Sequence, residues 1–219
     1  MPKVGVLLSG CGVQDGSEIY ESVLTILALE KAGASWLAMA PDVEQAHIVN
    51  HYTGEEERLH TRHALTEAAR IVRGKISAVS EISAHDIDAL IIPGGYGVAK
   101  NLTTFAIDGV EARVNPNVER MIQDLHALGK PIGAICIAPV LVALALRGEN
   151  PQLTVGDDAL TSLALNRLDA HHHVTKVDEI FVDEGNNIVS TPAFMLAHSA
   201  SEAEPGITKL VNKVLELIP

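Results

Sequence analysis

The stretch PIGAICIAPVLV, residues 131–142, joins a short apolar strand to an apolar helix through a single cysteine, Cys136. A turn this tight holds its central residue in a strained backbone conformation and requires small residues two positions before and after it. Ala134 and Ala138 occupy those positions. The pattern predicts a strand–nucleophile–helix elbow; the alternative is a buried structural cysteine at the end of a strand.

The expected position of Cys136 also predicts its reactivity. The N-terminus of the following helix would point its dipole and free N–H groups at the sulfur and lower the pKa of the thiol. The other cysteine, Cys11, lies in a glycine-flanked turn without such an elbow. We therefore expect Cys136 to be alkylated before Cys11.

Short apolar runs alternate with helical segments along the chain, which is typical of βαβ units around an open parallel sheet. The expected strands are residues 3–9, 35–40, 88–97 with a terminal Gly-rich turn, 131–136 and 152–158. The expected helices are residues 17–31 with Ser17 as N-cap, 61–74, 116–129, 138–146 and 193–217. Two short strands around Gly-Asn-Asn within 179–192 predict an antiparallel hairpin at one edge, and the polar stretch 42–60 is expected to project over one face. A single domain over residues 1–219 is expected.

Composition excludes several classes of function. The chain of 219 residues carries a net charge of −12, which argues against a nucleic-acid partner. Although 47% of the residues are apolar, no run approaches the roughly 18 residues that would span a membrane, and the N-terminus lacks the basic region of a secretory signal. Two distant cysteines do not form a disulfide framework. These observations favour a soluble cytosolic or organellar domain, and we expect a cytoplasmic location with no membrane partner.

A second motif, IIPGGYG at residues 91–97, follows a buried strand. The Gly94–Gly95 turn allows backbone N–H groups to approach a ligand closely, as an oxyanion hole requires. In an open α/β sheet this turn and Cys136 would both lie at the carboxyl ends of strands, where the ligand crevice forms. A simple tight turn is the alternative interpretation.

The stretch SGCGVQDGSEIYESV, residues 9–23, supplies candidate carboxyl groups. With Ser17 as the N-cap, Glu18 lies at the exposed start of the helix and Glu21 lies deeper, beside the end of the first strand. A buried carboxyl group there would serve as a general acid or base. The alternative is that both glutamates only complement the helix dipole.

The same stretch supports a rival hypothesis of dinucleotide binding. Gly10, Gly12 and Gly16 follow a first strand, and Asp42 follows the second. However, the expected helix starts after Gly16 rather than within the motif, and Pro41 separates the second strand from its acidic residue.

The histidines do not form a recognisable metal set. His47 and His51 would share a helical face, but no cysteine or acidic partner completes a site, so we expect no metal. Thiol catalysis usually uses a histidine base. No histidine lies just beyond the Cys136 elbow, and His173 is the best remaining candidate.

Taken together, GAICIAP, IIPGGYG and the first-helix glutamate resemble the class I glutamine amidotransferase-like fold in its PfpI/ThiJ branch. The motifs PGGYGVAKNL (93–102) and STPAFMLA (190–197) resemble the ElbB-type glyoxalases within it, and the similarity is collinear over nearly the whole chain. The resemblance implies a flavodoxin-like open parallel sheet between helices. It also implies conversion of glyoxal or similar small 2-oxoaldehydes with water to 2-hydroxy acids, without a cofactor.

The resemblance also implies roles for individual residues. The nucleophile falls on Cys136, the oxyanion-hole groups fall on Gly94 and Gly95 with the Ile137 N–H, and the acidic residue falls on Glu21. Glu18 lies three residues away, so the register between the two glutamates stays open. Amidotransferase relatives place a histidine after the strand that follows the elbow, and residues 152–158 offer none.

Glutamine hydrolysis is therefore not expected. The expected partners are a small aldehyde and a second copy of the chain in a homodimer. A non-catalytic binding or redox-sensing module that uses the reactive cysteine is the alternative function.

Overall fold

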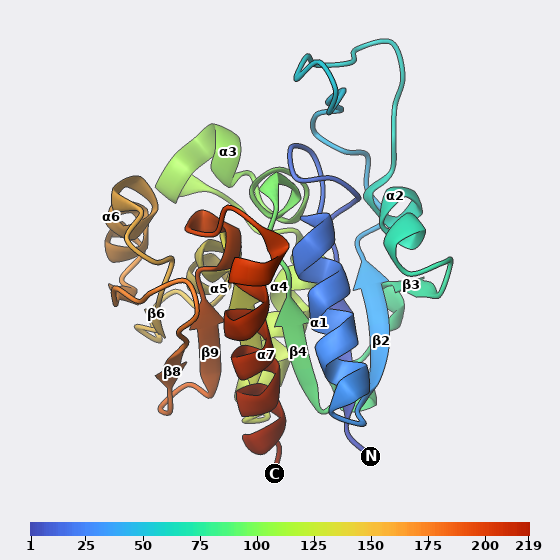
Figure 1. Cartoon of the computed structure of the whole chain (residues 1–219). Coiled ribbons are helices and arrows are strands. Elements are labelled where there is room, and N and C mark those ends of the chain that lie inside the picture. The colour runs from blue at the N-terminus through green and yellow to red at the C-terminus, as the bar shows by residue number, and fades with distance from the viewer.

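A seven-stranded sheet runs through the molecule in the order β3-β2-β1-β4-β5-β9-β8 (Figure 1). The computed structural model describes all residues, 1–219. The strands of this sheet are β1 (Lys3–Leu7), β2 (Ser35–Ala40), β3 (Ile76–Ala78), β4 (Ala89–Ile92), β5 (Ile132–Ile135), β8 (Phe181–Asp183) and β9 (Ile188–Thr191). All neighbouring strands are parallel except β8 and β9, which form the expected antiparallel hairpin at one edge.

Helices cover both faces of the sheet, which explains why β4 and β5 are buried along their whole length. One apolar cluster joins the sheet to α1 (Ile19–Lys31), α2 (Ala64–Ile71) and α7 (Ala200–Glu216). A second cluster joins the opposite face to α4 (Pro116–Ala127) and α5 (Ala138–Ala145). This arrangement confirms the flavodoxin-like α/β fold. None of the helices has the length and apolar character needed to cross a membrane.

Two short helices, α3 (Phe105–Asp108) and α6 (Ala159–Arg167), lie beyond the carboxyl ends of the strands (Figure 1). No helix was predicted at α6, and residues 152–158 were expected to form one strand. Only β6 (Gln152–Leu153) is extended, and it pairs with β7 (His171–His172) in a separate two-stranded sheet. Asp158 then caps α6, with its side chain accepting the Thr161 N–H at 2.7 Å.

The last helix begins later than the sequence predicted. Residues Ala193–Met195 form a separate 3-10 turn, η5, and Ala193 has a φ of 42°, which a continuous helix does not allow. The helix α7 starts at Ala200, after Ser199 accepts the Glu202 N–H. The chain therefore bends at η5 and presents this turn to the crevice.

The N-cap of α1 is Glu18 and not Ser17. The Ser17 hydroxyl is fully buried and accepts the Ser9 N–H at 2.8 Å, so it is not available to the helix. Residues 42–60 extend away from the sheet above α2 (Figure 1), whereas the sequence predicted that they would project over one face. A π-helical turn, η3 (Val98–Leu102), follows the Gly94–Gly95 turn.

Candidate functional site

Cys136 lies at the tight turn between β5 and α5. Its φ is 63°, in the left-handed region that L-residues seldom occupy. Ala134 and Ala138 on either side are fully buried, and the Cys136 N–H donates to the Thr191 carbonyl at 2.9 Å. The elbow geometry predicted from the sequence is therefore present, and it aims the sulfur toward the carboxyl edge of the sheet.

Two backbone N–H groups, those of Gly95 and Ile137, point at the Cys136 sulfur. Neither donates to another backbone carbonyl. Gly95 adopts a φ of +96°, and a Cβ at this position would collide with the backbone of Gly16 and Glu18. Only glycine fits this turn, which leaves its N–H free for a ligand.

Gly94 plays a different part from the one expected. Its N–H donates to Glu21 Oε2 at 2.7 Å and is therefore not free to hold an oxyanion. A Cβ on Gly94 would lie 2.6 Å from the Cys136 Cβ and 2.8 Å from Glu21 Oε2. Gly94 thus holds the carboxyl group and leaves room for the cysteine beside it.

Glu21 is a fully buried carboxyl group beneath the cysteine. Besides the Gly94 N–H, it accepts the Phe194 N–H at 3.3 Å through Oε1 and forms a hydrogen bond with the Cys136 thiol. Burial, and then the neighbouring Glu18 carboxylate, raise the pKa of Glu21 to about 8. Glu21 therefore holds a proton at neutral pH.

The pKa of the Cys136 thiol is raised well above its usual value, first by burial and then by the Glu21 carboxylate. The expectation of a lowered pKa was wrong. The Gly95 and Ile137 N–H groups lower the pKa of the thiol, as predicted. This effect is smaller than the increase in pKa that burial causes. The cysteine and the carboxyl group titrate together, and at neutral pH the pair holds one proton more than the two groups would in water.

Glu18 is not at an exposed helix start, as the sequence suggested. Only 8% of the residue is exposed, because the true cap position turns its side chain back over the first turn. Its Oε2 accepts the Glu21 N–H at 2.7 Å, and burial raises the pKa of Glu18 as well. Glu18 borders the cavity, whereas Glu21 lies behind the sulfur.

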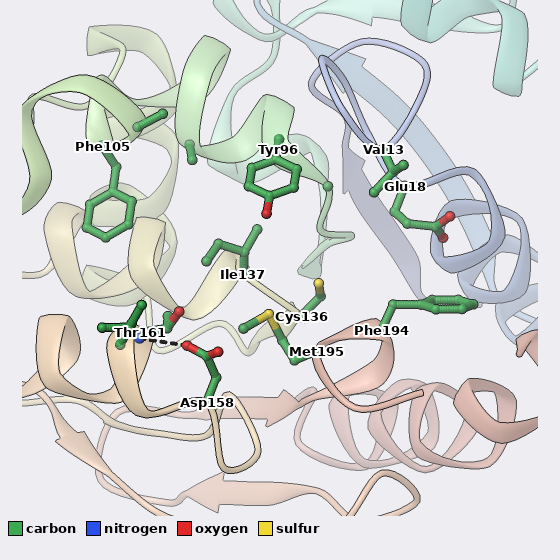
Figure 2. Close-up of a pocket in the computed structure, with 14 residues that line it drawn as sticks. Val13, Glu18, Tyr96, Phe105, Cys136, Ile137, Asp158, Thr161, Phe194 and Met195 are labelled. Carbon is green, nitrogen blue, oxygen red and sulfur yellow. Dashed lines mark hydrogen bonds between the residues drawn. The ribbon is translucent and has the colours of Figure 1, made fainter. Parts of the chain in front are cut away.

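A cavity of about 370 Å³ opens over Cys136. In Figure 2, Phe105 and Thr161 lie on one side of Cys136 and Ile137, and Val13, Glu18 and Phe194 lie on the other, with Tyr96 above. The ring of Phe194 stacks on Tyr20 with 6.0 Å between centroids. The 14 lining residues are Val13, Glu18, Gly95, Tyr96, Ala99, Phe105, Ala106, Cys136, Ile137, Asp158, Leu160, Thr161, Phe194 and Met195.

Several of these wall residues were not identified from the sequence. Phe105, Leu160 and Met195 come from α3, α6 and η5. The segment of Phe105 was expected to be a loop and that of Met195 a helix, and no element was predicted at Leu160. The Asp158-x-x-Thr161 spacing was the one available signal, because an aspartate that caps a helix marks its start.

No histidine lines the cavity. His173 stacks on Phe181, with 3.9 Å between ring centroids, and its Nε2 lies 3.0 Å from Gln152 Oε1. It belongs to the edge of the small sheet and not to the cysteine. A Cys-His-Glu triad is therefore not formed. No group of three or more His, Cys, Asp or Glu side chains is placed to hold a metal ion.

The glycine-rich loop after β1 does not form a dinucleotide site. The helix α1 begins at Ile19, after the motif, and the carboxyl group of Glu18 occupies its N-terminus. An acidic cap repels the phosphates that this loop would have to bind. Instead, Gly12 and Gly16 shape a loop that packs against the Gly94–Gly95 turn.

Comparison with known proteins shows extensive similarity. A human relative, "Glutamine amidotransferase-like class 1 domain-containing protein 3, mitochondrial", is 46% identical over 98% of this chain and 83% of its own length. A crystal structure from Ehrlichia chaffeensis, described as an isoprenoid biosynthesis protein with an amidotransferase-like domain, is 30% identical, with a TM-score of 0.93 and full coverage of both chains. Glyoxalase III from Candida albicans, at 11% identity and a TM-score of 0.64, covers 100% of this chain and 98% of its own and shares the fold alone.

These relatives correct the cytoplasmic location expected from the sequence. The human relative and further relatives from Rattus norvegicus and Danio rerio are all named as mitochondrial proteins.

The family model for the DJ-1/PfpI family matches residues 11–198, a range that includes both glutamates, the Gly94–Gly95 turn and the cysteine elbow. With the relatives and the fold described above, this match identifies the chain as a member of the DJ-1/PfpI family.

Proposed function

We propose that this protein is a cofactor-independent glyoxalase that converts 2-oxoaldehydes and water to 2-hydroxy acids. The observation that carries the proposal is the pairing of the Cys136 thiol with a buried Glu21, whose pKa is raised to about 8, at the base of an apolar cavity. Acid–base chemistry on a small carbonyl compound needs both a nucleophile and a group that carries a proton near neutral pH. The fold shared with a glyoxalase from Candida albicans is compatible with this activity.

The reaction begins with addition of the Cys136 sulfur to the aldehyde carbon. The thiol proton passes to the Glu21 carboxylate as the carbon–sulfur bond forms, so the fraction of the pair with Glu21 ionised is the reactive one. The oxyanion of the resulting hemithioacetal is placed between the Gly95 and Ile137 N–H groups. In this proposal Gly94 is a positioning residue, since its N–H holds the carboxyl group.

The hemithioacetal then isomerises and is hydrolysed. Glu21 passes its proton to the oxyanion, and its carboxylate removes the hydrogen from the carbon bonded to sulfur. Loss of this hydrogen gives an enediolate. The carboxyl group returns the proton to the neighbouring carbon, and the hydroxyl proton of the sulfur-bearing carbon moves to the oxygen of that neighbouring carbon, which leaves a thioester beside an alcohol carbon. Water cleaves the thioester, releases the 2-hydroxy acid and restores the thiol. No electrons are gained or lost overall, so the step needs no redox cofactor.

A redox-sensing role is less compatible with the site. Oxidation selects exposed thiols with a low pKa. Cys136 is buried, and its pKa is raised by burial and by Glu21.

The test is the consumption of glyoxal or methylglyoxal by the purified protein, with glycolate or lactate identified by NMR. Cys136→Ala should abolish turnover, and Glu21→Gln should lower kcat about 10²–10⁴-fold, because the amide has no transferable proton. The predicted homodimer is measured on the same samples by light scattering.

Glu18→Gln is the matched control, because it makes the same chemical change three residues away. Glu18 contributes to the raised pKa of Glu21 but does not contact the sulfur, so we expect a loss of about tenfold or less. Loss of turnover in Glu18→Gln but not in Glu21→Gln would transfer the proton-carrying role to Glu18. Absence of aldehyde consumption above a free-thiol control would refute the proposed activity.

A further inference from the structure

The cavity over Cys136 is much larger than the smallest 2-oxoaldehyde. Its volume of about 370 Å³ lies within the range of about 300–1,000 Å³ that is typical of sites for larger organic ligands. Glyoxal is little larger than a few water molecules, each of which occupies about 30 Å³ in the liquid. Glyoxal would leave most of the cavity as water against apolar walls.

The walls of the cavity are hydrophobic. Ten of the 14 lining residues are hydrophobic; among them Met195 lies beside the cysteine and Phe105 lies across the cavity from Phe194 (Figure 2). The apolar lining continues to the mouth, where Val13, Tyr96 and Leu160 are 40%, 57% and 81% exposed. Exposed apolar side chains that are continuous with a cavity mark the path of an apolar ligand.

The charged residues of the lining are all acidic. They are Glu18 and Asp158, and the lining contains no lysine, arginine or histidine. A ligand with a carboxylate or phosphate on its tail would therefore meet like charge and find no counter-ion in this low-dielectric site. The tail that fits is apolar and carries no negative charge.

We propose that the site acts preferentially on 2-oxoaldehydes with an uncharged apolar tail, of which an aryl glyoxal is the model, with the tail directed past Phe105 toward Leu160. This inference deepens the proposed function and rests on it. Desolvation of the tail by the apolar walls supplies selectivity, because each added methylene in such a pocket changes kcat/KM about tenfold or more.

The experiment compares three substrates: glyoxal, phenylglyoxal and 4-carboxyphenylglyoxal. We expect kcat/KM to be at least about tenfold higher for phenylglyoxal than for glyoxal, and at least about tenfold higher than for the carboxylated compound. Equal or better use of glyoxal, or equal use of the carboxylated compound, would overturn the inference and leave the glyoxalase activity standing.

Matched variants separate pocket selectivity from the intrinsic reactivity of the aldehydes. Leu160→Glu puts a charge in the lining and should lower the ratio of kcat/KM for phenylglyoxal to kcat/KM for glyoxal about tenfold or more. Leu163→Glu, on the same helix but outside the lining, should leave this ratio unchanged. Asp158→Asn keeps a good helix cap and should raise the relative kcat/KM of the carboxylated substrate severalfold. A ratio that is unaffected by Leu160→Glu would contradict the assigned path of the tail.

A binding measurement decides the inference if no aldehyde is turned over. Acetophenone, which has the aryl tail but no aldehyde, should bind Cys136→Ser protein in ligand-observed NMR, and Leu160→Glu should weaken that binding. Benzoate, of similar size but anionic, should not bind. Binding of acetophenone without turnover would refute the glyoxalase and retain the apolar site; no binding and no turnover would refute both.

Discussion

The protonated state of Glu21 makes the stability of the protein depend on pH in an unusual direction. The pKa of this carboxyl group is 4.5 in the unfolded chain and about 8 in the folded protein. Between these values the folded state binds a proton that the unfolded state has lost. The stabilisation is complete below pH 4.5 and is lost as the pH rises through about 8.

The size of the effect follows from linkage. In this window each pH unit lowers the free energy of unfolding by about 1.4 kcal/mol, so Glu21 alone removes about 2–3 kcal/mol between pH 6 and pH 8. Cys136 does not contribute in that interval, because its thiol keeps its proton up to about pH 9 in the unfolded chain and to a higher pH in the folded protein. The Glu21→Gln variant removes the titrating group and should lose this part of the pH dependence.

The assay is urea denaturation of the wild type and Glu21→Gln at several pH values from 6 to 8. The amide places an NH2 group near the Phe194 N–H, which lowers the stability of the variant by an amount that is independent of pH. The difference in unfolding free energy between the two proteins should therefore shift by about 2 kcal/mol in favour of the variant as the pH rises. If the unfolding free energies of the two proteins change with pH in parallel, Glu21 is ionised in the folded protein and the reasoning is refuted.

Three further outcomes are expected. Gly94→Ala should lower the unfolding free energy by about 1–3 kcal/mol in urea denaturation and abolish turnover, because its Cβ would lie 2.6 Å from that of Cys136; an active, stable variant would contradict the packing. Iodoacetamide at neutral pH should modify Cys11, which is partly exposed, at least as fast as Cys136 in peptide mass spectrometry, and the opposite order would indicate a lowered pKa at Cys136. Exhaustive EDTA treatment should leave turnover unchanged, since no three metal-ligating side chains converge; loss of activity that added zinc restores would disprove this.

The features that the sequence predicted well depend on local pattern. The elbow needs only a strand, a cysteine, a helix and two small neighbours, and all of them lie within residues 131–142. The parallel sheet follows from apolar runs that are buried on both faces, such as β4 and β5. These signals do not depend on which distant segments meet.

The features that were missed depend on contacts between distant segments. The Ser17 hydroxyl was assigned to the helix cap because serine is a good cap, but packing of the first loop pairs it with Ser9 and leaves Glu18 at the cap. The pKa of Cys136 depends on its burial and on Glu21, which is distant in the sequence. The local geometry of the elbow predicted only the effect of its N–H groups, which lower the pKa of Cys136 and are weaker than burial and Glu21 together.

The backbone conformation of Cys136 separates what folding favours from what chemistry requires. At a φ of 63°, an L-residue costs roughly 1–2 kcal/mol that glycine would avoid. Glycine at position 136 would relieve this strain, but the turn would then carry no sulfur. The strain at Cys136 is therefore what this turn costs in stability in order to place a thiol at the base of the cavity.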